Sequence, residues 1–148
     1  MAYQFKLEAL RRFRQYQEER LQKELAEAVS RREHAAAELN AMVARRAETE
    51  SELTRCQNES SAGASQFCIY VRYLQRLELE IGAHRKNLAG IEEEVDSRRD
   101  SLLEAVKKRK ALEKLKEKGL KAYISGLDRE EQKFINEIAI NRFGAKTQ

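Results

Sequence analysis

Proline and tryptophan are absent from this chain of 148 residues, and aromatic residues make up only 7% of it. Because proline interrupts helices, its absence permits helices of any length. Ala, Glu, Lys, Leu and Arg dominate and charged residues reach 36%, which is the composition of long helices and coiled coils. Such a chain buries a thin seam rather than a thick core. A deep substrate pocket is therefore not expected, and this argues against an enzyme.

Residues that could carry chemistry are equally scarce. The two cysteines, Cys56 and Cys68, are too few for a disulfide framework. His34 and His84 have no cysteine or second histidine at metal-ligand spacing. No Ser-His-Asp arrangement, phosphate loop or glycine fingerprint is present. The sequence predicts a non-enzymatic protein with no metal and no cofactor, in which both cysteines act as small seam residues.

Long apolar runs are also missing, so no membrane span and no secretory signal is expected. A soluble, cytosolic protein is the expectation. The net charge is +4, from 29 basic and 25 acidic residues that are finely mixed. That balance alone does not identify a nucleic-acid binder.

Within residues 66–118 an apolar residue recurs at alternating steps of three and four. These steps average 3.5 residues, which is the period of a coiled-coil seam. The pattern predicts one long helix whose narrow stripe needs a partner. Its two stripes are Phe67, Leu74, Ile81, Leu88, Val95, Leu102 and Tyr70, Leu77, His84, Ile91, Arg98, Ala105, Leu112.

A weaker seam occupies residues 21–56, interrupted by Arg32, Arg46 and Thr49. Its apolar members are Leu21, Leu25, Ala28, Ala35, Leu39, Met42, Leu53 and Cys56. Residues 57–66 are rich in Ser, Asn and Gly, which indicates that the helix stops there. A reversal near Ala62 and Gly63 would fold the first seam back onto the second.

The predicted fold is therefore all-α, a long antiparallel two-helix coiled coil in which residues 1–148 form a single helical hairpin. We expect a first helix at about 4–57, a turn at about 58–65 and a second helix at about 66–143. The alternative is one continuous helix in a parallel dimer. In the hairpin, facing residue numbers add to about 125. That register places Leu39 near Leu88, Met42 near His84, and Leu21 near Ala105.

Three outlying segments need partners or solvent. Residues 1–20 are amphipathic and basic. Residues 107–121 hold eight basic residues against two acidic ones. This basic segment is either a solvated helix face or a footprint for an acidic partner, a nucleic acid or a membrane surface. Residues from about 122 onward outrun the first helix, which leaves Phe134, Ile138 and Phe143 without an internal partner.

The sequence also resembles the FliJ family of the bacterial flagellar export apparatus. The resemblance rests on FKLEAL at 5–10, on YVRYLQRLE at 70–78 followed by Ile81 and His84, and on EQK at 131–133 with Arg142 and Phe143 near the end. These motifs are individually loose. Their order and positions together span the whole chain.

The resemblance implies an antiparallel two-helix stalk with both termini at the end that inserts into the export ATPase hexamer. The expected partners are that hexamer, the export gate membrane protein and substrate chaperones, with no nucleic acid. The isolated protein would be a cytoplasmic monomer, recruited to the inner face of the inner membrane. The apparatus would be flagellar or a related injectisome.

The family pattern also implies two sets of contact residues. Export-gate binding would fall on Tyr73, Leu77, His84 and Met42. ATPase-ring binding would fall on Phe5, Leu10, Phe13, Phe134, Ile138 and Phe143.

Overall fold

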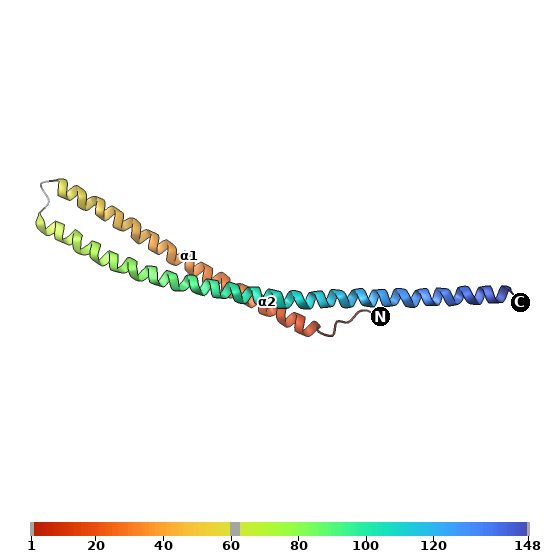
Figure 1. The fold of residues 1–148 in the computed structure, drawn as a ribbon. Helices are drawn as coiled ribbons and strands as arrows, with labels where there is room; N and C mark the ends of the chain where they lie inside the picture. Colours follow the sequence, from red (N-terminus) through yellow and green to blue (C-terminus); the bar gives the residue numbers. More distant parts are fainter. Residues whose placement is uncertain (1, 60–62, 148) are drawn as a thin grey trace. The chain divides into compact units, whose positions relative to one another are not determined.

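The computed structural model describes residues 2–59 and 63–147, and these residues form two long helices that pack against each other. Helix α1 runs from Glu8 to Asn58 and helix α2 from Ala64 to Lys146 (Figure 1). The predicted all-α hairpin is confirmed, and the continuous helix of a parallel dimer is wrong. The expected centre of the turn, Ala62, lies outside the described residues.

Helix α1 begins at Glu8 rather than at about residue 4. The Glu8 amide donates a hydrogen bond of 3.1 Å to the carbonyl of Phe5, and the Arg11 amide donates one of 2.9 Å to that of Leu7. A carboxylate in the first turn suits the positive end of the helix dipole. Tyr3, outside the helix, packs its ring against Tyr123 of α2, with ring centroids 5.7 Å apart.

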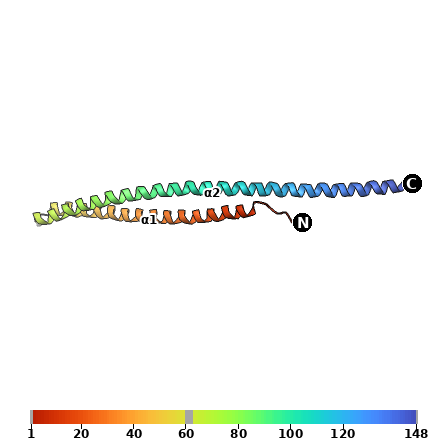
Figure 2. The same ribbon diagram turned by 90° about the horizontal axis from the view of Figure 1, so that it is seen from below.

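The described chain divides into two compact units, and the first comprises residues 20–102. In this unit α1 and α2 lie side by side and antiparallel, as both views of the ribbon show (Figures 1 and 2). Arg31 bonds to Glu94 and Arg98 to Glu24, each at 2.9 Å. These residue numbers add to 125 and 122, which agrees with the predicted register.

The seam of this unit follows the expected heptads. Ile81 and Val95 are each only 1% exposed, and Ala28 is fully buried. Positions that looked like interruptions in the sequence belong to the seam as well. Thr49 is buried and its hydroxyl donates to the Arg45 carbonyl at 2.8 Å. Arg32 and Arg46 are half-buried, because long arginine stems can lie along an apolar seam while the charge stays in water.

Phe67 does not belong to the seam, contrary to the prediction. Its side chain is exposed. The register would place it opposite Asn58, where α1 ends. Nothing on α1 remains to cover it, so the buried part of α2 starts at Tyr70, which is half-buried.

The second unit combines residues 2–19 with residues 103–147. Arg109 bonds to the buried carboxylate of Glu18, and Lys116 bonds to Glu8 at 3.0 Å. The seam of α2 continues at the same spacing to Gly119 and Tyr123. All described residues from 124 to 147 are exposed.

The apolar stripe of this exposed segment does not lie on the face of α2 that continues the seam. Seam positions on α2 would continue through residues 119, 123, 126, 130, 133 and 137. Five large apolar residues come one position after a seam position, so their stripe is rotated by about 100° around the helix. Those residues are Leu120, Ile124, Leu127, Phe134 and Ile138. An extension of the seam would therefore not cover this stripe.

Candidate interaction surfaces

The described residues offer surfaces rather than a catalytic site. No group of three His, Cys, Asp or Glu side chains is placed to hold a metal ion within residues 2–59 and 63–147. The hollows in this part of the chain are grooves along the helices. Recognition by contact is the chemistry that such surfaces support.

One groove, of about 190 Å³, lies between the helices within residues 20–102. It is lined by Arg45 of α1 and by Tyr73, Arg76, Leu77 and Glu80 of α2. The Arg76 side chain donates to the Glu80 carboxylate at 3.1 Å. Tyr73 is 39% exposed, whereas Leu77 is only 2% exposed. Tyr73 can therefore meet a partner directly, and Leu77 forms the floor beneath it.

Two other residues of the predicted gate set lie in the seam. Met42 and His84 are both half-buried, and neither lines the groove beside Tyr73. The structure thus brings Tyr73 and Leu77 to one groove and leaves Met42 and His84 in the seam. Arg45 contributes to the groove from α1.

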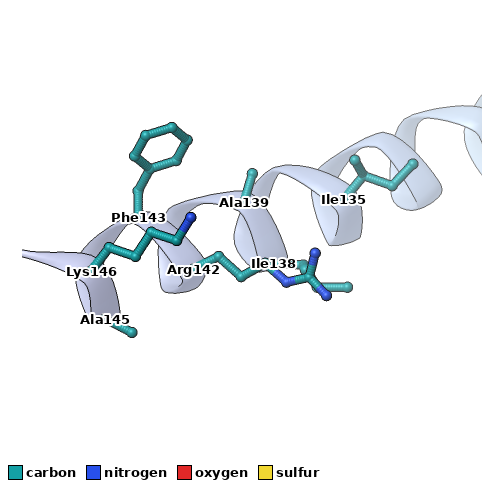
Figure 3. Close-up of a pocket in the computed structure, with 7 residues that line it drawn as sticks. All are labelled: Ile135, Ile138, Ala139, Arg142, Phe143, Ala145 and Lys146. Atoms are coloured by element: carbon teal, nitrogen blue, oxygen red, sulfur yellow. The ribbon is translucent and has the colours of Figure 1, made fainter.

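The C-terminal surface comprises the exposed apolar residues of α2 beyond Tyr123. Phe134 is 63% exposed and Phe143 is 78% exposed. A hollow of about 740 Å³ follows one side of the helix here. Figure 3 shows Ile135, Ala139 and Phe143 projecting from the same side. The hollow's full lining is Ile135, Ile138, Ala139, Arg142, Phe143, Ala145 and Lys146.

The predicted residues of the N-terminal segment differ in exposure. Phe5 is half-buried, whereas Leu10 and Phe13 are exposed. The Arg14 guanidinium lies 5.9 Å from the centre of the Phe13 ring, within reach of a cation–π contact. Sequence reasoning missed Tyr3, because its contact with Tyr123 joins residues 120 positions apart and no local period announces it.

Neighbouring side chains shift the pKa of Glu8, Glu94 and Tyr70. Hydrogen bonds from Arg11 and then Lys116 lower the pKa of Glu8 to about 2. Arg31 and then Arg98 lower the pKa of Glu94. Near the turn, Cys56 and then Glu52 raise the pKa of Tyr70.

Neither helix contains, within the described residues, an apolar stretch that could cross a bilayer. A family model described as flagellar FliJ protein matches residues 3–148. Comparison with curated proteins and with solved structures gives no match.

Proposed function

Because the chain belongs to the flagellar FliJ family, whose members are generally non-catalytic components of the flagellar export apparatus, we propose that it is the stalk of the export ATPase. In this role the C-terminal surface, together with Leu10 and Phe13, inserts into the ATPase hexamer. A stalk alters the ring only if it contacts one conformation of the ring more favourably than another. The observation that carries the proposal is the run of exposed apolar residues on α2 beyond Tyr123.

The groove beside Tyr73 is the proposed contact for the export gate. Tyrosine presents an apolar ring and a hydroxyl, which is the combination favoured where a protein surface meets a partner. His84 and Met42 flank this contact from the seam. By the same family argument the protein is cytoplasmic, joins the inner membrane peripherally and escorts substrate chaperones.

The ring contact is tested by truncating its apolar side chains. The variant carries Phe134→Ala, Ile138→Ala and Phe143→Ala, and the readout is stimulation of the partner ATPase together with binding to it. Full burial of each large apolar side chain contributes about 1.5–3 kcal/mol. The three losses should therefore weaken binding at least about 100-fold and abolish stimulation at matched concentrations.

The matched control truncates two apolar side chains of α2 outside this surface, Leu79→Ala and Leu103→Ala. Both residues are more than half exposed in the structure. The control should stimulate the ATPase like the unmodified protein. Full stimulation by the triple variant would instead place the coupling surface on residues 2–19.

A further inference from the structure

Five lysines lie on one face of α2, and we call them the lysine stripe. Their spacing of three, four, four and three residues keeps all five within a sector of about 80° at 100° per residue. All five side chains are exposed. The stripe consists of Lys107, Lys110, Lys114, Lys118 and Lys121.

The lysine stripe is not used to hold the hairpin together. Lys121 bonds to Glu117 of the same helix at 3.1 Å. In the part of the chain that the structure describes, the other four lysines form no ion pair. Arg109 and Lys116, which face α1, are instead paired with Glu18 and Glu8. Arg109 and Lys116 are thus neutralised across the seam, whereas four of the five lysines on the outer face form no ion pair in the described structure.

Position on the helix keeps the stripe accessible. The stripe lies on the side of α2 opposite the seam, so α1 does not cover it. On the opposite side of α2, over the same stretch, Arg109 and Lys116 bond to Glu18 and Glu8 of α1. The five charges are therefore presented along one line of about 21 Å, at 1.5 Å per residue.

Apolar side chains share the outer face with the lysines. Leu103 lies in the same sector and Ala111 borders it, whereas Leu115 lies between this face and the seam. Leu103 and Leu115 are 58% and 51% exposed. Two carboxylates, Glu104 and Glu117, stand near its edges, and Glu117 is the one that bonds to Lys121. A cluster of lysines on one face of a helix is attracted to the headgroups of anionic lipids.

We propose that the lysine stripe binds the surface of an anionic membrane, with the axis of this part of α2 parallel to the bilayer. The stripe holds lysine and no arginine, and lysine acts as a point charge without the bidentate geometry that carboxylate recognition favours. It holds no aromatic residue on which a base could stack. Anionic lipids diffuse laterally and can gather beneath all five ammonium groups at once.

The contacts of Glu8 with Lys116 and of Glu18 with Arg109 place Leu10 and Phe13 beside the same stretch of α2, so one molecule would bind either the membrane through the stripe or the ATPase ring. The stripe needs no partner protein and would bind lipid even if the ATPase contact were absent. The two proposals can therefore fail separately. A lipid contact would supply peripheral attachment without any membrane-spanning segment.

The test is sedimentation of the full chain with vesicles of phosphatidylglycerol and phosphatidylethanolamine. The stripe variant replaces all five lysines with Gln. Each lysine near an anionic surface should contribute about fivefold in partitioning. The variant should therefore bind at least about 100-fold more weakly. Binding by the unmodified chain should fall steeply between 0.01 and 1 M salt, because the Debye length shrinks from about 30 to 3 Å.

A control variant removes the same charge elsewhere. It replaces five exposed cations that form no ion pair in the described structure, Lys6, Lys23, Arg72, Arg85 and Lys86, with Gln. Both variants should keep the helicity of the parent by circular dichroism. Weak binding by the stripe variant alone supports the stripe. Equal losses in the two variants would show that net charge is responsible and would overturn the proposal.

Orientation gives a second readout. A polarity-sensitive dye at Ala111, in a chain with Cys56→Ala and Cys68→Ala, should report transfer to the headgroup region. The same dye at Ala9, an exposed residue of α1, should not. Stripe-dependent binding to duplex DNA or polyglutamate with no binding to anionic vesicles would overturn the membrane proposal, as would equal binding to phosphatidylcholine vesicles.

Discussion

Gly119 of α2 is in contact with the N-terminal segment, and this contact requires a residue without a side chain. A Cβ built at Gly119 would lie 2.1 Å from the hydroxyl oxygen of Tyr3, so a side chain here would displace the tyrosine. Gly90 on the same helix has nothing within 4 Å of a built Cβ. Both glycines weaken the helix relative to alanine, but only Gly119 gains a neighbour in return.

The contrast between these two sites predicts that substitution of glycine by alanine has different effects at positions 90 and 119. Gly90→Ala should raise the free energy of unfolding by about 0.8–1.0 kcal/mol, which is the gain in helix propensity. Gly119→Ala should give no such gain, because it expels Tyr3. In a Tyr3→Ala background, Gly119→Ala should recover the gain. Urea denaturation of the parent, the two single variants at positions 3 and 119 and their double variant measures the coupling between these positions. Additive changes in the free energy of unfolding would show that the Tyr3 side chain does not pack against Gly119.

Glu8 predicts a pH dependence at the start of α1. Its pKa is lowered from 4.5 to about 2 by Arg11 and then Lys116. A lowered pKa stabilises the folded state above the unfolded value. The contribution should therefore be complete above about pH 4.5 and be lost as the pH falls towards 2.

Comparison with Glu8→Gln isolates this contribution from other carboxylates. The difference in denaturation midpoint between parent and variant should shrink between pH 6 and pH 2.5. Glu48→Gln, at an exposed glutamate that forms no ion pair in the described residues, should show no such change. A constant difference for Glu8→Gln would indicate that its ion pairs do not form in solution.

At the scale of the helices, the contribution of an ion pair to the free energy of unfolding depends on how deeply the pair is buried. The side chains of Arg109 and Glu18 are 22% and 11% exposed, whereas those of Arg31 and Glu94 are 53% and 34% exposed. Arg109→Leu leaves a buried carboxylate unpaired and should cost about 3 kcal/mol. Arg31→Leu should cost at most about 1 kcal/mol.

The paired variant Glu18→Leu with Arg109→Leu tests the cause. It removes both charges from the seam, so stability should return close to that of the parent. Urea denaturation monitored by circular dichroism gives the free energies of unfolding. Persistent destabilisation of the paired variant would mean that packing rather than charge explains the loss.

The register of the helices also predicts a crosslink. Leu39 and Leu88 are both half-buried, and their numbers add to a value near those of Arg31 and Glu94. Cysteines at 39 and 88, in a chain without Cys56 and Cys68, should crosslink within one molecule. Cysteines at 39 and 83 should not, because Ala83 is exposed. Crosslinks only between molecules would contradict the hairpin.

Most of the seam could be predicted from periodicity, because residues such as Ile81 and Val95 repeat every seven positions and pack accordingly. Polar members such as His84 and Arg98 fitted the period, but others could not be predicted. Glu18 and Arg109 look like surface residues in sequence, and only their mutual contact across 91 positions makes them seam residues. The contact of Tyr3 and the start of α1 at Glu8 could not be predicted either, because they depend on contacts between residues far apart in the sequence. The predicted contact residues were placed by family resemblance, and exposure now separates Tyr73 from the buried Leu77.

At the scale of the whole molecule, the ion pairs between the helices form within one chain. We therefore predict that the isolated protein sediments as a monomer of 17.2 kDa. The exposed apolar residues beyond Tyr123 are the first place where self-association would begin. Sedimentation equilibrium over a wide concentration range measures the mass, and a dimer at the lowest concentration would contradict the prediction.

The constant register also restricts how the lengths of the helices can change. Removing seven residues from α1 alone, between Arg31 and the turn, would slide the ion pairs between the helices by a full heptad, and Glu24 would no longer meet Arg98. Removing seven facing residues from each helix would keep both the heptads and the pairings. Insertions and deletions should therefore be tolerated as matched heptads on the two helices, whereas the segment beyond Tyr123 is free to lengthen or shorten by itself.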